Sequence, residues 1–222
     1  MINFHTHHED KLAAIQVIQV YPKDGRKAIA RGGLRDFSLG LHPWFVTEDF
    51  SNELEGLRNI LATPSLSQRI IAVGECGIDR VINRDRLDLQ IQVFRQQIRL
   101  ANQYKKALVI HCVRAHQDVL QILKQEENKM PVIFHGVNNK FETIAPVLEA
   151  GYYCSFGYAL FVEGSPVLDT FLRTPLDRLF LESDDREDGV AEVYKRAAVL
   201  RGVEPKTLKM LIRDNYKRIN KQ

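Results

Sequence analysis

Eight short apolar runs recur along the chain, and most of them alternate with longer segments of helical periodicity. The runs are rich in β-branched and aromatic residues, which is typical of β-strands. Between most of them, apolar residues return every three or four positions, as Leu54, Leu57 and Leu61 do in a helix expected from about Ser51. The eight predicted strands cover residues 1–7, 13–21, 37–43, 70–75, 107–111, 131–135, 152–156 and 179–184.

This alternation predicts a parallel sheet covered by helices, because parallel neighbours need a long crossover that is usually helical. Two architectures fit the pattern, a doubly wound open sheet and a (β/α)₈ barrel. We favour the barrel, because chemically active side chains follow several different strands, as they do in barrel enzymes. The prediction is one TIM-type (β/α)₈ barrel domain over residues 1–222, a length that can bury a single core.

The first strand and the second are too close in sequence for a regular unit. Only a short polar stretch around residues 8–11 separates them, whereas a parallel crossover needs about a dozen residues or more. We therefore expect that the first helix is missing, and that residues 13–21 pair antiparallel with residues 2–7 or lie at a distorted seam. Residues 23–35, which hold three glycines, are predicted to form a loop that can include a short turn of helix.

Composition and charge are those of an ordinary globular protein, with 45% hydrophobic residues and a formal net charge of +3. This charge is too small to argue for a polyanionic substrate. The sequence has no recognisable signal peptide and no apolar run long enough to span a membrane. Three widely spaced cysteines disfavour a disulfide framework, so we expect a cytoplasmic protein. Basic residues near the C-terminus are expected on the solvated face of the last helix: Lys206, Lys209, Arg213, Lys217, Arg218 and Lys221.

Histidines and carboxylates stand at the ends of the apolar runs. In a strand, His5 and His7 share one face, because alternate side chains point the same way. Five of the seven histidines fall at such ends. Burying several uncompensated imidazoles is costly, and a bound metal ion offsets that cost. The strand-end residues are His5, His7, His42, Glu75, His111, His135 and Asp184.

Nitrogen and oxygen ligands without thiolates suit Zn²⁺, Mn²⁺ or, with more carboxylate, Mg²⁺. We predict two divalent ions, roughly 3.5–4 Å apart and bridged by Glu75, as in hydrolytic two-metal sites. His5 and His7 with Asp184 would hold one ion, and His111 with His135 the other. Glu75 and Asp184 are the predicted catalytic residues. A water activated between the ions would be the nucleophile, and Asp184 would take its proton and pass it to the leaving group.

An ordered set of motifs resembles the TatD family of metal-dependent hydrolases nearly from end to end. The resemblance implies a TIM-type barrel, hydrolysis that is most often described as deoxyribonuclease activity, and metal ligands at His5, His7, Glu75, His111, His135 and Asp184. The motifs are His5-Thr6-His7, Gly40-Leu41-His42-Pro43, Ala72-Val73-Gly74-Glu75-Cys76-Gly77-Ile78-Asp79, Ile110-His111, Phe134-His135, Gly151-Tyr152-Tyr153, Ser155-Phe156-Gly157, and Pro175-Leu176-Asp177-Arg178 leading to Glu182-Ser183-Asp184.

Several positions depart from the family pattern and mark a divergent, short member. Asn3 stands where the family has aspartate, and Val113 where it has an arginine, with Arg114 displaced by one. The stretch after Asp184 lacks the usual proline. His42 and Arg114 are the predicted substrate-binding residues, although His42 also fits a structural donor.

Three functions remain open on these residues. The leading one is a metal-dependent phosphodiesterase, most specifically a deoxyribonuclease, acting on DNA or another phosphodiester. The second is a small-molecule or aminoacyl ester or amide hydrolase on the same metal centre, which Val113 favours because an arginine is the natural fork for phosphate. The third is a degenerate interaction module, which the complete ligand set argues against. We expect no membrane partner and a monomer, with an oligomer left open.

Overall fold

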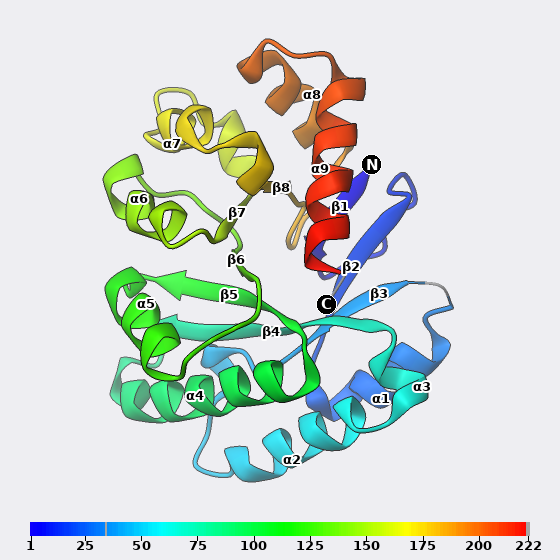
Figure 1. Ribbon diagram of the computed structural model, residues 1–222, viewed down its shortest axis with the longest axis vertical. Coiled ribbons are helices and arrows are strands. Elements are labelled where there is room, and N and C mark those ends of the chain that lie inside the picture. Colours follow the sequence, from blue (N-terminus) through cyan, green and yellow to red (C-terminus); the bar gives the residue numbers. More distant parts are fainter. Residues whose placement is uncertain (34, 221–222) are drawn as a thin grey trace. The chain divides into compact units, whose positions relative to one another are not determined.

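A computed structural model describes residues 1–33 and 35–220. Leu34, which belongs to the predicted loop at residues 23–35, and Lys221 of the predicted basic face lie outside the described residues. The strands are β1 Ile2–Thr6, β2 Ile15–Val20, β3 Asp36–Leu39, β4 Ile70–Asp79, β5 Ala107–Val113, β6 Val132–Phe134, β7 Tyr153–Phe156 and β8 Leu179–Leu181 (Figure 1). The α-helices are α1 Pro22–Arg31, α2 Phe50–Leu61, α3 Pro64–Ser67, α4 Leu87–Tyr104, α5 His116–Gln125, α6 Phe141–Glu149, α7 Val167–Arg173, α8 Ala191–Arg201 and α9 Pro205–Ile219.

The strands follow one another in the sheet in sequence order, from β1 to β8. The contacts of the chain fall into two compact units, and the divisions between them lie inside β2 and β6. The first unit combines residues 1–18 with residues 133–222, and the second is the continuous segment 19–132. A single domain over residues 1–222 therefore stays a prediction.

In the second unit, β3 pairs with β4 and β4 with β5, in parallel. Helix α4 lies along β4 and β5 (Figure 1). Its apolar residues Val93, Phe94 and Ile98 are buried, because their spacing places them on one face of the helix. At β3, Gly40 passes so close to the backbone of Gly74 that an added Cβ would lie 2.7 Å from it, so only glycine fits there. The strands carrying the predicted site residues are thus packed backbone to backbone.

In the first unit, β6, β7 and β8 are parallel neighbours, and β1 pairs with the start of β2. The last strand also joins the first: Asp184 N donates to His5 O at 3.1 Å, and His7 N donates to Asp184 O at 3.2 Å. Phe4 of β1 stacks on Phe180 of β8, with ring centroids 4.1 Å apart. Main-chain bonds and an aromatic stack therefore hold the two ends of the strand series together.

The connection from β1 to β2 is only partly as predicted. Residues 7–14 contain no helix, which confirms that the first helix is missing. Of the two alternatives for the pairing, the antiparallel one is wrong, because β1 and β2 are parallel. The register shift between Asn3 and Thr6 agrees with the other, a distorted seam. Ile15 pairs with Ile2, so the connection has to return only about 13 Å along β1, which eight residues can span without a helix.

Two further predictions from the pattern need correction. The predicted loop at residues 23–35, with at most a short turn of helix, is wrong in extent, because helix α1 is ten residues long and begins with Pro22 at its N-terminus. Its Gly25 is buried where a Cβ would lie 2.7 Å from Leu39, so tertiary packing explains a glycine that read as a loop signal. Glu75 does not end its strand either, since β4 continues to Asp79. Within the described chain, no helix combines the length and apolar character needed to cross a membrane.

Asp10, a buried carboxylate in the short β1–β2 connection, ties this region to β8 and α8. It accepts hydrogen bonds from the backbone of Leu12, at 3.0 Å, and from that of Val190, at 2.9 Å. Asn3 Nδ2 donates to Asp10 Oδ2 at 3.0 Å and to Ser183 Oγ at 2.8 Å, while Asn3 Oδ1 accepts from Ser183 N. The Asn3 amide therefore supplies the N–H donor that the buried Asp10 carboxylate needs.

Replacing Asn3 by aspartate should lower the free energy of unfolding by at least about 2 kcal/mol, because two buried carboxylates would then face each other without the connecting donor. Urea unfolding at neutral pH measures the loss. The double variant Asn3→Asp with Asp10→Asn should recover part of it, since an amide again faces a carboxylate. An Asn3→Asp protein as stable as the wild type would contradict this account.

Candidate functional site

In the second unit, Glu75 brings two predicted site histidines together. Its Oε1 lies 3.0 Å from His42 Nε2 and 2.9 Å from His111 Nδ1, and these two nitrogens are 3.2 Å apart. The Glu75 side chain is 3% exposed, and its ligand atom and those of the two histidines lie within 4.8 Å of one another. Three strands therefore contribute one tight group of two imidazoles and a carboxylate.

In each histidine, the hydrogen bond made by the ring nitrogen farther from Glu75 determines which nitrogen carries the proton. Trp44 N donates to His42 Nδ1 at 3.1 Å, so a neutral His42 carries its proton on Nε2 and donates to Glu75. That tautomer makes His42 a donor, not a metal ligand. His111 Nε2 lies 3.0 Å from Asp79 Oδ2 and donates to it, so Nδ1, beside Glu75, is the ring nitrogen that could bind a metal ion.

Asp79 is ionised in this arrangement. Burial alone would raise its pKa, but hydrogen bonds from Trp44, the backbone of Ile82, His111 and the backbone of Val81 lower the pKa below its usual value. Trp44 Nε1 donates to Oδ2 at 2.6 Å, and the backbone of Val81 donates to Oδ1 at 2.7 Å. Asp79 thus anchors its own loop and orients His111, a carboxylate–histidine pairing that is common behind metal ligands.

Two glutamines of α4 hold the loops that carry this group. Gln97 is paired with the backbone of Leu41, accepting from its N–H at 2.8 Å and donating to its carbonyl at 3.0 Å, next to His42. Gln90 Oε1 accepts from Asp79 N at 2.8 Å, and its Nε2 donates to Ile82 O. Gln90 and Gln97 are seven residues apart, so they share one helix face, and both are buried.

In the first unit, the pairing of β8 with β1 gathers a second group. His5 Nε2 and His7 Nε2 each lie 3.6 Å from Asp184 Oδ1. His5 is fully buried, whereas the Asp184 side chain is 42% exposed at the end of the strand. His135 joins them from the end of β6, with its ring centroid 4.2 Å from that of His5. Ligand atoms of His5, His135 and Asp184 lie within 4.8 Å of one another.

Glu182 belongs to the second group, and the pattern of strand-end histidines did not single it out. It is fully buried, its Oε1 lies 3.5 Å from His135 Nδ1, and it accepts from Gly136 N at 2.7 Å. Burial alone would raise its pKa, but the hydrogen bond and charge of His135, and the charge of His5, lower the pKa below its usual value. A signal was available in the sequence, since Glu182 stands two residues before Asp184 in the predicted strand 179–184, and strand alternation would place both on one face.

Both groups fit divalent metal ions by the chemistry of their donors. Each offers imidazole nitrogen and carboxylate oxygen within one small space, and each has a histidine backed by a second carboxylate, Asp79 or Glu182. Cys76 adjoins Glu75 but is fully buried, and burial, followed by the charge of Glu75, raises the pKa of its thiol. The thiol therefore stays protonated and is a poor ligand.

The structure places the remaining predicted residues as follows. Arg114 follows the end of β5, has a positive φ of 53° and is exposed, so its role in substrate binding stays a prediction. The predicted assignment of ligands to two ions, with Glu75 as the bridge, also stays a prediction. Trp44, which is not among the predicted site residues, links the loop after β3 to Asp79 at the end of β4, and its ring centroid lies 5.0 Å from that of His42.

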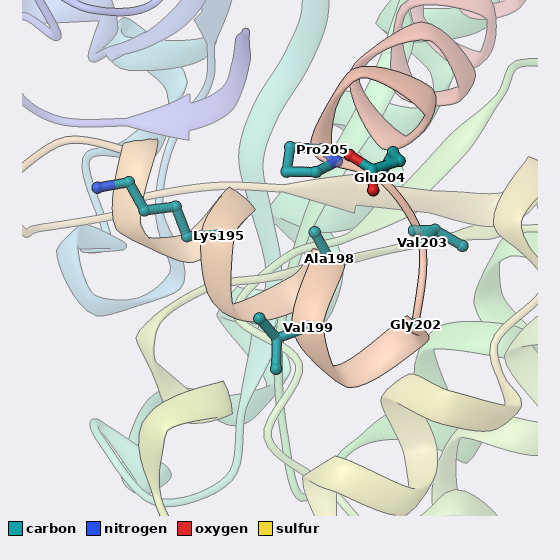
Figure 2. Close-up of a pocket in the computed structure, with 7 residues that line it drawn as sticks. All are labelled: Lys195, Ala198, Val199, Gly202, Val203, Glu204 and Pro205. Carbon is teal, nitrogen blue, oxygen red and sulfur yellow. The ribbon is translucent and has the colours of Figure 1, made fainter.

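The first unit has two hollows, which differ in the residues that line them. One of about 280 Å³ is lined by the loops that follow β6, β7 and β8 and includes Glu182 and Asp184. The other, of about 470 Å³, lies where α8 turns into α9, and its lining residues Ala198, Val199, Val203 and Pro205 are apolar (Figure 2). None of the residues that line the second hollow belongs to the two histidine groups. The first hollow is therefore the one associated with the candidate site.

Residues 3–221 match the family described as "TatD related DNase". An uncharacterized metal-dependent hydrolase of Buchnera aphidicola subsp. Baizongia pistaciae is 32% identical over 149 residues, or 66% of this chain and 54% of that protein. The uncharacterized metal-dependent hydrolase YcfH of Escherichia coli K12 is 27% identical over 198 residues, or 82% of this chain and 72% of YcfH. The matches span 54% and 58% of the lengths of the two Buchnera relatives.

Among solved structures, YjjV, a TatD homologue from Escherichia coli K12, resembles this chain with a TM-score of 0.88. The sequence identity is 18%, and the match covers 100% of this chain and 98% of YjjV. A TatD family hydrolase from Entamoeba histolytica gives a TM-score of 0.79 at 13% identity. The predicted TIM-type (β/α)₈ barrel is confirmed by this likeness, which agrees with parallel strands in sequence order and the bridge from β8 to β1.

Trp44 is the only tryptophan of the chain, so its fluorescence should report metal binding at Glu75 and His111. Its ring centroid lies 5.7 Å from that of His111, and both side chains bond to Asp79. Zinc added to chelator-treated protein should change the emission, and His111→Ala should abolish the change. His8→Ala, at an exposed histidine, should leave it intact. An unchanged response in His111→Ala would refute metal binding there.

Removing the carboxylate behind His111 should weaken metal binding without removing a ligand. We expect Asp79→Asn to lower zinc affinity about 10–100-fold, the usual cost of losing such a partner. Competition with a chromophoric chelator measures the affinity. Asp118→Asn, which breaks an exposed ion pair with Arg80, is the control and should bind zinc as the wild type does. Equal affinities in the wild type and Asp79→Asn would show that Asp79 only anchors its loop.

Proposed function

Because the chain belongs to the TatD-related DNase family of metal-dependent hydrolases, we propose that it is a divalent-metal-dependent phosphodiesterase that acts on DNA. The observation that carries the proposal is the buried Glu75, whose Oε1 lies within 3.0 Å of nitrogen atoms of both His42 and His111. A carboxylate and imidazoles in this arrangement form a donor set for a divalent cation, whereas burying these polar groups in a purely structural core would be costly.

The proposed metal ligands are the six strand-end residues His5, His7, Glu75, His111, His135 and Asp184, which would hold two ions of zinc, manganese or magnesium. When bound, such ions would activate water and stabilise charge on the phosphoryl oxygens. Asp79 and Glu182 hold the rings of His111 and His135 in orientation. Asp184, the most exposed carboxylate of the set, would accept a proton from the attacking water and return it to the leaving group, a role that its exposure supports.

His42 has a different part in this scheme. Its Nδ1 accepts from the backbone of Trp44, so its Nε2–H is a donor that holds Glu75 in place. The loop that carries it is fixed by Gln97 on α4. His42 therefore positions the carboxylate and can offer the same N–H to a substrate oxygen. This supports both alternatives that the sequence left open for His42.

A second candidate function is hydrolysis of carboxylic esters or amides on the same centre. It is favoured by Val113, a valine where the family pattern has an arginine that could grip a phosphate. Metal-loaded protein that leaves DNA intact but hydrolyses such substrates would establish it. A third, non-enzymatic reading as an interaction module predicts protein without bound metal, so elemental analysis of the purified chain separates it from the other two.

The proposal predicts metal-dependent release of nucleotides from the ends of single-stranded DNA. Glu75→Gln should lower this activity at least about a hundredfold, because the variant loses the negative charge that would bind the metal ion and so help to activate the attacking water. A nuclease assay with labelled oligonucleotides and added manganese measures it. Glu55→Gln, at a surface ion pair with Arg58, is the matched control and should retain full activity. Full nuclease activity in folded Glu75→Gln would overturn the assignment.

A further inference from the structure

The hollow of about 280 Å³ in the first unit contains an arginine that has no part in the scheme above. Its walls are the loops after β6, β7 and β8, and they include Asn138, Tyr158, Asp184 and Arg186. Loops at the carboxyl ends of barrel strands are where substrates of such folds bind. Asp184, a proposed metal ligand, faces this space, so whatever occupies the hollow lies beside the reacting centre.

Charge in the hollow is uneven. Glu182, Asp184 and Asp185 supply carboxylates, while Arg186 is the single cationic side chain among its lining residues in the described chain. Metal ions at the proposed ligands would neutralise the carboxylates that bind them. An anionic substrate entering this hollow would then find its one fixed positive side chain at Arg186.

Arg186 is held in a way that leaves it available to a ligand. Its guanidinium carbon lies 4.8 Å from the centre of the Tyr158 ring, a cation–π contact. Tyr158 is anchored in turn, since its hydroxyl donates to Gly189 O at 2.9 Å. Arg186 Nη2 donates to Asp188 Oδ2 at 2.8 Å, but the two side chains are 59% and 60% exposed. Such a surface ion pair is weak and exchanges easily.

We propose that Arg186 is the phosphate-binding residue of this site, and that a phosphate group of the substrate takes the place of Asp188 on its guanidinium. The aromatic face of Tyr158 keeps the guanidinium plane in the hollow, and its fork of N–H donors matches two phosphate oxygens. The inference rests on the proposed phosphodiesterase function and makes it more specific. It assigns the substrate to the phosphoesters, because a neutral carboxylic ester has no group that would displace Asp188.

The test is calorimetric titration of inorganic phosphate into metal-loaded protein at constant ionic strength. Arg186→Gln should weaken phosphate binding about tenfold or more, the usual effect of losing a charge-assisted pair. Arg186→Lys should recover only part of the loss, because an ammonium lacks the fork. Asp188→Asn should act in the opposite direction and tighten binding about two- to fivefold, because it removes the competing carboxylate.

Arg173 provides a matched control in the same unit. Its guanidinium lies 3.4 Å from the centre of the Phe141 ring and pairs with Asp169 at 3.3 Å, and its side chain is 49% exposed. Arg173 is not among the lining residues of the hollow, so Arg173→Gln should bind phosphate as the wild type does. Because Arg173 makes the same kinds of contact outside the hollow, this control shows whether phosphate binding depends on an arginine in the hollow or only on the total positive charge.

The inference is overturned if phosphate binds Arg186→Gln as tightly as the wild type, if Asp188→Asn does not tighten binding, or if the wild type binds no phosphate. These results are distinct from failure of the proposed function. Wild-type protein that binds phosphate through Arg186 but does not cleave DNA would refute the nuclease assignment and leave the anion site standing. Nuclease activity and phosphate binding that are both unaffected by Arg186→Gln would refute the role of Arg186 and leave the nuclease assignment standing.

Discussion

The pairing of the last strand with the first is the constraint on which the first unit depends. The backbone N–H of Asp184 donates to the carbonyl of His5, and the Asn3 side chain is hydrogen-bonded to both the main chain and the side chain of Ser183. These bonds bring Asp184 Oδ1 to 3.6 Å from Nε2 of both His5 and His7, although nearly the whole chain separates Asp184 from the two histidines in sequence. Residues so far apart in sequence cannot be brought together by local structure, so the geometry of this group depends on the hydrogen bonds between β1 and the end of β8.

The two units solve the problem of buried histidines in the same manner. His111 is backed by Asp79 and His135 by Glu182, and both carboxylates have pKa values lowered by the donors around them despite their burial. An ionised partner fixes which ring nitrogen carries the proton and therefore which one can bind a cation. The second carboxylate of each group thus matters as much to the chemistry as the ligands themselves.

Most of the fold and the strand-end residues could be predicted from the sequence, because burial gives each strand a continuous apolar run and each proposed ligand follows such a run. The errors came from positions where tertiary contacts outweigh local signals. Gly25 reads as a loop residue but packs against Leu39 inside α1. The β1–β2 pairing is parallel because the connection returns only part of the way along β1. Asp10 and Glu182 were missed because neither belongs to a histidine motif, and their partners lie far away in sequence.

The two units also differ in how soon they can form during synthesis. Residues 19–132 are continuous, so the group around Glu75 is complete when little more than half of the chain has left the ribosome. Strand β1 is made first, but its outer edge is completed by Ser183 and Asp184, and its Ile2 is bonded on both main-chain atoms by the Tyr194 hydroxyl. His5 and His7 therefore emerge early, but their group is complete only after about the final 40 residues are made, so a nascent chain is expected to form its two candidate cation-binding groups in two separate stages.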